Sequence, residues 1–278
     1  MTENDYEWTF NEKRMLKYML ENDGMCFLRY FFKLREGAKF IINWHHFVIE
    51  HVLQQVYDGE ITRLIINIAP GYTKTEQAVI NFIARGLAIN PRAKFIHASY
   101  SADLAHENSS AIRNIVSSNE FQALWKMKLR TDTVAKRRWF TEHGGGMMAA
   151  AAGGQITGFR AGRMTSGFTG ALVLDDPVKP ADAYSTVRRC AVNDRFNNTL
   201  RSRLAVETVP IILIMQRIHD EDLTGYLLRG GSGEKWHHLC IPTLFDEEQR
   251  YFEYNKEFTH SDRIDINDIL CQLCNTKQ

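Results

Sequence analysis

The sequence has 278 residues, of which 44% are hydrophobic and 24% are charged, and its formal net charge is +1. This composition excludes a disordered chain, and the near-neutral charge excludes a protein that is basic over its whole surface. The longest apolar runs, such as 64–68 and 211–215, have the length of strands, and the N-terminus lacks the apolar stretch of a signal peptide. We therefore expect no membrane span and a cytoplasmic location.

The five cysteines are an odd number in a chain without a signal peptide, which argues for reduced thiols and against a disulfide framework. Cys271 and Cys274 form a CxxC pair, and His237, His238 and Cys240 form a second, looser group. A structural zinc site needs four ligands held together. Packing or a place in the tail is therefore the favoured interpretation of both groups.

In chain order, residues 1–59 are expected to be helical, because apolar side chains recur there at helical spacing and Asp58-Gly59 ends the pattern well. The apolar run RLIINIAPG from Arg63 predicts a strand closed by a tight turn, and helical spacing resumes up to residue 90. A second strand at 94–99 is followed by a second helix. Such repeated units predict a mainly parallel sheet with crossover helices on both faces.

Residues 144–170 are rich in Gly, Ala, Ser and Thr, and they are predicted to form a flexible or ligand-facing stretch outside the core. An apolar strand follows at 171–176, then an arginine-rich helix at about 181–204, a buried strand within 209–217 and a short helix. After about Gly230 the pattern weakens to a polar tail. The predicted organisation is a helical lid (1–59), an α/β core (60–230) and a linker or tail (231–278).

The segment IAPGYTKTE, residues 68–76, stands at the first strand-to-helix turn. A phosphate-binding loop needs a lysine for the β- and γ-phosphates and a hydroxyl for Mg²⁺, and Lys74 and Thr75 supply them at the positive end of a helix dipole. Ile68 and Thr73 stand where glycines are expected, and a positive φ at Thr73 would strain a β-branched residue. An ordinary turn with a surface lysine is the alternative.

The segment ALVLDDP, residues 171–177, ends a buried strand with two carboxylates. Buried parallel strands deliver ligand-facing residues at that edge, so Asp175 would hold Mg²⁺ and Asp176 would polarise the attacking water. The alternative is that the pair merely ends a strand. A Lys-Thr turn after one strand and an acidic pair after another is the arrangement of a P-loop ATPase with an inserted strand between them.

A third motif, residues 211–225, is a strand that ends in polar residues. Gln216 or Arg217 could sense the γ-phosphate and transmit its loss to a moving element. Alternatively, residues 219–222 form a solvated helix start with acids near its N-terminus.

Six segments between Trp44 and Gly225 occur in the order seen in the large terminase subunits of tailed phages, and the chain resembles the ATPase half of that family. They are WHHFVIEHVLQQVYDGEITRLIINIAPGYTKTE, KFIHASYSADLAHENSSAIRNIV, GGQITGFRAG, ALVLDDPVKPADAYS, DRFNNTLRSRL and IMQRIHDEDLTG. The resemblance implies an additional-strand P-loop ATPase that binds ATP and Mg²⁺. It also implies a homo-oligomeric ring in the host cytoplasm that moves double-stranded DNA, with the portal protein and the terminase small subunit as further partners.

The resemblance also implies roles for particular residues. Trp44 and His45 would lie near the adenine, and the phosphate loop would comprise Pro70, Gly71, Tyr72, Thr73, Lys74 and Thr75. Asp175 and Thr75 would take the metal, and Asp176 the catalytic carboxylate role. Many such motors carry Glu where Asp176 stands. Because the sequence ends at Gln278 without the family's nuclease domain, nuclease activity is not expected.

A ring ATPase usually takes an arginine from a neighbouring subunit to stabilise transition-state charge. Arg160 and Arg163 are the candidates, with a surface or phosphate-contacting role as the alternative. DNA contact could come from either of two basic clusters, each of which could instead be a solvated face. The first cluster is Lys126, Lys128, Arg130, Lys136, Arg137 and Arg138, and the second is Arg188, Arg189, Arg195, Arg201 and Arg203.

Two other functions stay open. A helicase-like ATPase would share the core but would separate nucleic-acid strands. A non-catalytic terminase remnant would dock on the portal or the small subunit without turning over ATP, and the degenerate phosphate loop and the missing nuclease domain favour it.

Overall fold

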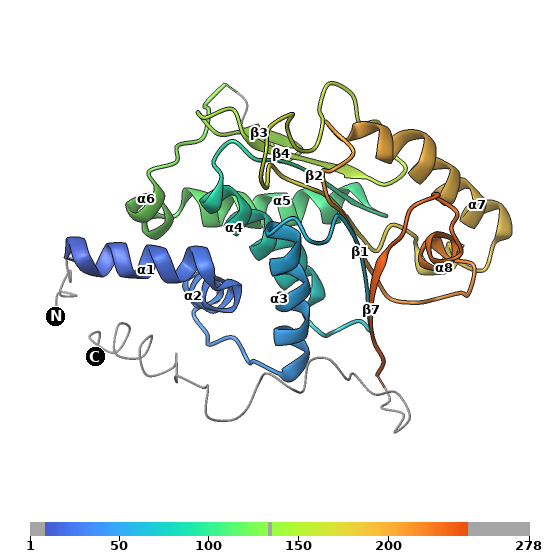
Figure 1. Ribbon diagram of the computed structural model, residues 1–278, viewed down its shortest axis with the longest axis horizontal. Coiled ribbons are helices and arrows are strands. Elements are labelled where there is room, and N and C mark those ends of the chain that lie inside the picture. Colours follow the sequence, from blue (N-terminus) through green and yellow to red (C-terminus); the bar gives the residue numbers. More distant parts are fainter. Residues whose placement is uncertain (1–8, 133–134, 244–278) are drawn as a thin grey trace.

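The computed structural model describes residues 9–132 and 135–243, which form one seven-stranded sheet between two layers of helices (Figure 1). The strand order is β3-β4-β2-β5-β6-β1-β7, and every pair is parallel except the antiparallel pair β3–β4 at one edge. The strands are β1 (Arg63–Ile68), β2 (Lys94–Ser99), β3 (Arg138–Phe140), β4 (Gly146–Ala151), β5 (Leu172–Asp175), β6 (Ile211–Met215) and β7 (His237–Ile241).

Helices α1 to α6 cover one face of the sheet, and α7 and α8 cover the other (Figure 1). The α-helices are α1 (Phe10–Asn22), α2 (Gly24–Glu36), α3 (Trp44–Tyr57), α4 (Phe82–Ile89), α5 (Ala102–Ser117), α6 (Asn119–Trp125), α7 (Thr186–Arg195) and α8 (Leu223–Leu228). The π-helices are η1 (Glu76–Asn81) and η3 (Phe196–Leu200), and the 3₁₀ helices are η2 (Pro180–Asp182) and η4 (Arg201–Arg203). The described residues contain no helix long and apolar enough to span a bilayer.

The core lies on both faces of the sheet, because successive strand residues point to opposite sides. In β1, Leu64 and Ile66 pack with the helices of the first layer, whereas Ile65 packs with those of the second. The N-terminal helices belong to the first layer, since Leu20 of α1 and Phe27 of α2 share the cluster of Ile66. The predicted N-terminal helices are therefore present, and they pack directly on the α/β core.

Strand β6 lies between β1, which leads to the predicted phosphate turn, and β5, which ends in the acidic pair. All residues of β1, β5 and β6 are buried, as expected for a parallel sheet covered on both faces. The predicted fold class is confirmed in these features: a mainly parallel sheet with helices on both faces and an additional strand at this position.

The sequence predictions miss three strands, the short β3 together with β4 and β7. Residues 146–151, expected to be flexible, form β4, and Met147 and Ala149 are fully buried against β2 and α5. His237–Ile241, expected to belong to an irregular tail, pair with β1 as β7, and their mostly exposed polar side chains suit an edge strand. Cys271 and Cys274 lie outside the described residues.

Candidate nucleotide-binding site

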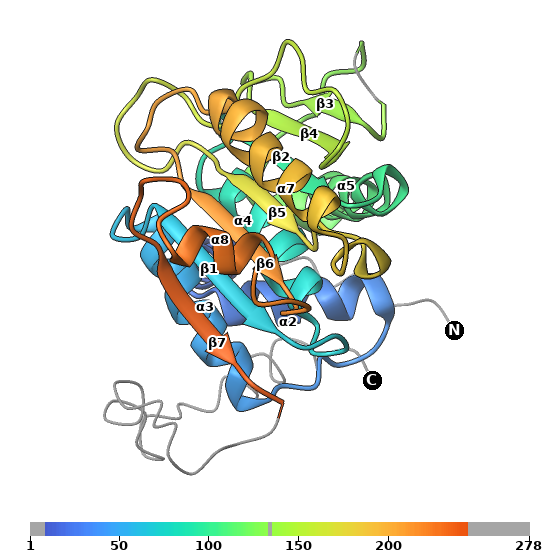
Figure 2. The ribbon, with the colours of Figure 1, turned by 90° about the vertical axis from the view of Figure 1, so that its right-hand side faces the viewer.

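The three predicted motifs lie at the carboxyl ends of the neighbouring strands β1, β6 and β5 (Figure 2). The turn 69–75 follows β1, Asp176 follows β5, and Gln216 follows β6. Because the three strands are parallel, their carboxyl ends meet at one edge, which is where open α/β sheets bind ligands. The topology thus brings together three motifs that are far apart in the sequence.

Two side-chain contacts join the turn after β1 to the end of β5. The ammonium of Lys74 lies 2.7 Å from Oδ2 of Asp176. The hydroxyl of Thr75 donates a hydrogen bond of 2.7 Å to Oδ2 of Asp175. Lys74 is 7% exposed and Asp175 is 5% exposed, so both contacts lie in a region shielded from bulk water. The lysine and hydroxyl of the turn therefore face the two carboxylates directly.

The turn itself contains two left-handed residues, Gly71 with φ of 84° and Thr73 with φ of 55°. Glycine adopts this conformation at no steric cost, but a β-branched residue rarely does. The hydroxyl of Thr73 donates to the carbonyl of Tyr72 at 2.8 Å and contacts Nε2 of His46 at 2.7 Å. The chain becomes helical at Lys74 and continues as the π-helix η1. Thr73 thus has the positive φ that would strain a β-branched residue, and the hydrogen bonds of its side chain hold it in that conformation.

Asp175 has the features of a metal ligand. Its Oδ1 is buried and has no hydrogen-bond partner among the described residues. Burial, and after it the neighbouring Asp176, raises the pKa of Asp175 to about 6, although Thr75 and Lys74 oppose this shift. A cation would offset both the burial of the charge and the unpartnered oxygen.

The donor set fits Mg²⁺. This ion prefers oxygen ligands and is usually held by one or two carboxylates, with phosphate oxygens and waters completing its shell. Asp175 and Thr75 supply a carboxylate and a hydroxyl side by side. The described residues contain no group of three His, Cys, Asp or Glu side chains that could enclose a metal ion by themselves. The arrangement therefore suits an ion that arrives with a phosphorylated ligand.

Asp176 is held in place from three sides. Its φ is 42°, a left-handed value that Asp tolerates better than most residues. Its backbone N–H donates to Ile214 at 2.8 Å, and its carbonyl accepts from the N–H of Tyr100 at 3.1 Å. The backbone N–H of Gln216 donates to its Oδ1 at 3.1 Å. Asp176 therefore connects the ends of β2, β5 and β6, and Gln216 reaches it through its main chain.

Trp44 and His45 lie at the start of α3, beside the turn. Trp44 is 49% exposed, whereas His45 is buried, with its ring 5.3 Å from the ring of Tyr72. Burial lowers the pKa of His45, so its neutral form is favoured. The role of the two residues in adenine binding stays a prediction.

His46 belongs to this site as well, although the sequence pattern does not indicate it. Its side chain lies between Asn43 at the start of α3 and Thr73 in the turn. A histidine three residues after an Asn N-cap is compatible with a capping box, but that pattern does not reveal a contact with residue 73. The sequence gives one signal for such a contact. Thr73 is a β-branched residue where a phosphate-binding loop usually has glycine, so another residue is needed to stabilise the turn.

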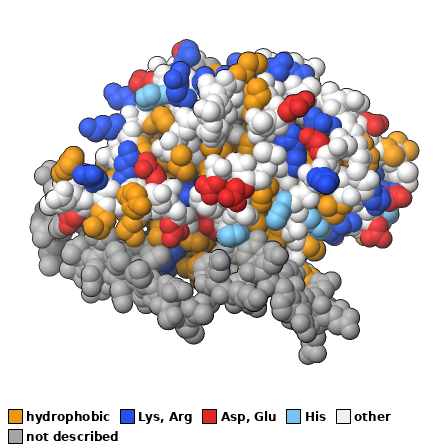
Figure 3. Space-filling model, in the orientation of Figure 1, with side chains coloured by type: hydrophobic (Ala, Val, Ile, Leu, Met, Phe, Trp, Pro, Cys, Tyr) orange, Lys and Arg blue, Asp and Glu red, His pale blue; other side chains and the backbone are white. Residues whose placement is uncertain are grey.

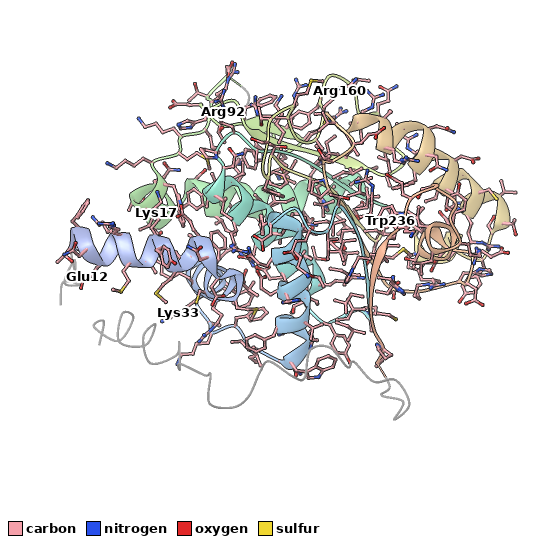
Figure 4. The ribbon with its side chains drawn as sticks, viewed as in Figure 1. Glu12, Lys17, Lys33, Arg92, Arg160 and Trp236 are labelled. Carbon is pink, nitrogen blue, oxygen red and sulfur yellow. The ribbon has the colours of Figure 1, made fainter. Side chains whose placement is uncertain are left out.

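Arg160 and Arg163 lie at the opposite end of the sheet from the acidic pair. Arg163 donates to the carbonyls of Arg92 and Gly144, next to the start of β2. Arg160 is exposed on the upper rim in Figure 4, and it donates to the carbonyl of Leu204 at 3.1 Å. A strand of five or six residues is about 15–20 Å long. Neither arginine therefore belongs to the site of its own chain, and action on a neighbouring subunit stays a prediction.

The two basic clusters differ in how free their side chains are. Arg189, Arg195 and Arg201 of the second cluster are engaged with backbone carbonyls. In the first cluster, Arg137 donates to the carbonyl of Gln155 at 2.9 Å, whereas Lys126, Lys128 and Lys136 are exposed, near β3 and β4. Lys and Arg side chains occur along the upper rim of the molecule in Figure 3, the side on which β3 and β4 lie in Figure 1. The first cluster is thus the more accessible of the two.

Comparisons with known proteins give distant structural similarities. No protein-family model matches the sequence, and no curated protein matches it. The structure is similar to the HK97 bacteriophage large terminase, with 15% identity and a TM-score of 0.49 over 83% of this chain and 45% of that chain. It is also similar to S. cerevisiae Dbp5 bound to Nup159, Gle1, IP6 and ADP, with 12% identity and a TM-score of 0.41 over 68% of this chain and 47% of that chain. The chain spans less than half the length of either protein.

Proposed function

We propose that the chain is an ATP-hydrolysing motor domain that uses Mg²⁺. The observation that carries the proposal is the pair of contacts between the turn and the acidic strand end, Lys74 to Asp176 and Thr75 to Asp175. Phosphoryl transfer needs a cation for the phosphates, oxygen ligands for Mg²⁺ and a carboxylate that orients water. Lys74, Thr75 with Asp175, and Asp176 supply these three in turn.

Each residue has one task in this proposal. Lys74 binds the β- and γ-phosphates. Its ion pair with Asp176 breaks when they bind, because the ammonium then contacts the phosphates. Asp176 then accepts a hydrogen bond from the attacking water, while the Gln216 N–H keeps the carboxylate in place. Asp175 and Thr75 would hold Mg²⁺, which neutralises charge on the phosphates when bound.

We further propose that ATP turnover drives movement of double-stranded DNA, as the sequence resemblance to large terminase subunits implies. The first basic cluster, in which Lys126, Lys128 and Lys136 are exposed, is the favoured DNA-contacting surface, because such side chains bind phosphates without reading sequence. In a ring, Arg160 of one subunit would face the phosphate site of the next. The portal protein and the terminase small subunit are the further partners that this function requires.

The test is ATP turnover by the purified chain, alone, with duplex DNA, and with DNA and portal protein. We expect turnover that needs Mg²⁺ and rises with DNA, and its loss in Lys74→Ala but not in Lys39→Ala, which changes an exposed lysine. A folded protein with no turnover under all three conditions would support the non-catalytic remnant. Turnover accompanied by displacement of a labelled strand would support the helicase-like function.

A further inference from the structure

We infer that His46 is a positioning residue that holds the phosphate turn in its left-handed conformation at Thr73. This inference rests on the proposed function, because it assigns His46 a role in preparing the turn for phosphates. The turn lacks a glycine at residue 73, where φ is 55°. The side chain of His46 contacts that residue from α3, a different element of the fold.

The hydrogen bonds around the His46 ring fix its tautomer. The backbone N–H of Asn43 donates to Nδ1 of His46 at 2.9 Å, so Nδ1 carries no proton. Nε2 of the neutral ring therefore carries the proton and donates to the hydroxyl of Thr73 at 2.7 Å. That hydroxyl donates in turn to the carbonyl of Tyr72 at 2.8 Å. The result is an ordered chain of donors from the N-terminus of α3 into the turn.

The surroundings keep the ring neutral. Burial, and after it the nearby His45, lowers the pKa of His46 to about 4. The His46 ring lies 3.9 Å from that of His45 and packs against Phe40 at 4.8 Å. Its orientation is therefore set by packing as well as by hydrogen bonds.

A second contact joins His46 to the helix after the turn. The carbonyl of His46 accepts a hydrogen bond of 2.7 Å from the side chain of Gln77, which is 2% exposed. The backbone N–H of Gln77 donates to the carbonyl of Thr73 at 3.1 Å. One residue of α3 thus touches Thr73 directly through its ring and indirectly through Gln77. The two routes converge on the left-handed residue that precedes Lys74.

If His46 acted only by packing, the effects of substitutions at His46 and Thr73 would be additive. A double-mutant cycle tests this. His46→Phe keeps a ring of similar size but lacks the donor, and Thr73→Val keeps the branched shape but lacks the hydroxyl. We expect each single variant to raise the Kd of a fluorescent ADP analogue and the KM for ATP about tenfold, with a smaller change in kcat. The double variant is expected to be no weaker than either single variant.

His46→Gln is the matched rescue variant, because its amide can donate to Thr73. We expect its Kd to lie within about threefold of the unaltered protein. Glycine adopts a positive φ without strain, so in Thr73→Gly the turn no longer depends on His46. Adding His46→Phe to Thr73→Gly should therefore leave the Kd unchanged. Additive losses in the cycle, or equal losses from His46→Phe with Thr and with Gly at position 73, would overturn the inference.

Urea unfolding of the same variants without nucleotide separates this inference from the proposed function. If the unaltered protein binds no nucleotide, the proposed function fails. The contact itself is then judged by whether the effects of His46→Phe and Thr73→Val on the free energy of unfolding are non-additive. Additive effects on unfolding would show that the two side chains do not act together.

Discussion

The ammonium of Lys74 lies 2.7 Å from Oδ2 of Asp176, although the two residues are 102 positions apart in the sequence. This ion pair suits the site before a nucleotide binds, because the lysine and the carboxylate then neutralise each other. A bound triphosphate would take the lysine and leave the carboxylate to water. Under the proposed function, the pair would therefore link nucleotide binding to the release of the Asp176 carboxylate.

Lys74→Ala is expected to lower ATP turnover at least about a hundredfold, because it removes the cation that meets the phosphates and leaves Asp176 without its partner. Turnover should be measured at saturating Mg²⁺ over a range of ATP concentrations. Near-normal rates in this variant would remove the turn from the active site.

Asp176→Asn is expected to keep the Kd for ATP within about threefold while lowering kcat about a hundredfold or more. Asn tolerates the left-handed φ of 42° as well as Asp does, so the backbone should be preserved. Asp194→Asn on α7 is the control, since Asp194 is exposed. Equal losses in the two variants would mean that Asp176 has no special role in hydrolysis.

Arg160→Ala is expected to lower turnover on the order of 10³-fold, but only in the assembled ring. Mixing this variant with Lys74→Ala should restore part of the activity, because the intact turn of one subunit can then meet the intact arginine of its neighbour. Arg163 binds the carbonyls of Arg92 and Gly144, so Arg163→Ala should lower the melting temperature instead. If mixing restores nothing, Arg160 does not act between subunits.

His97 is expected to make the protein acid-sensitive. It is fully buried between Asn108 and the carbonyl of Val173, and burial lowers its pKa to about 4. In the unfolded chain His97 takes up a proton near pH 6.5, whereas in the folded protein it stays neutral until the pH is near 4. Its contribution to stability is therefore complete above pH 6.5 and is lost as the pH falls towards 4.

Between pH 6.5 and 4, the free energy of unfolding should depend less steeply on pH in His97→Gln. The expected decrease in slope is up to about 1.4 kcal/mol per pH unit. Urea unfolding at several pH values between 7 and 4.5 measures the slope. A substitution at the exposed His143 serves as the control. An unchanged slope in His97→Gln would mean that this ring is not the source of the acid sensitivity.

The strand-turn-helix at 63–89 and the acidic strand end were predictable, because apolar runs and turn residues are local signals. Strand β4 was not predictable, since Met147 and Ala149 are buried on the face that α5 covers and Met148 and Ala150 on the opposite face, which composition does not reveal. Strand β7 is an edge strand whose exposed side chains resemble those of a loop.

In the candidate site, sequence order and motif type indicated Lys74, Thr75 and both aspartates. The sequence could not show that Arg160 lies at the far end of the sheet, because that depends on where the loop before β5 runs. It could not show His46 against Thr73 either, since the packing of α3 on the turn is a tertiary contact.

Strand β7 also bears on how the protein should be produced. Because β1 is flanked by β6 on one side and β7 on the other, a recombinant protein that stops at Gly230 would leave the amide and carbonyl groups of β1 bare along a whole side. A bare, apolar strand of this kind recruits another copy of itself. Such a shortened protein should precipitate during purification, and the strand that would aggregate is β1, which leads into the candidate phosphate turn.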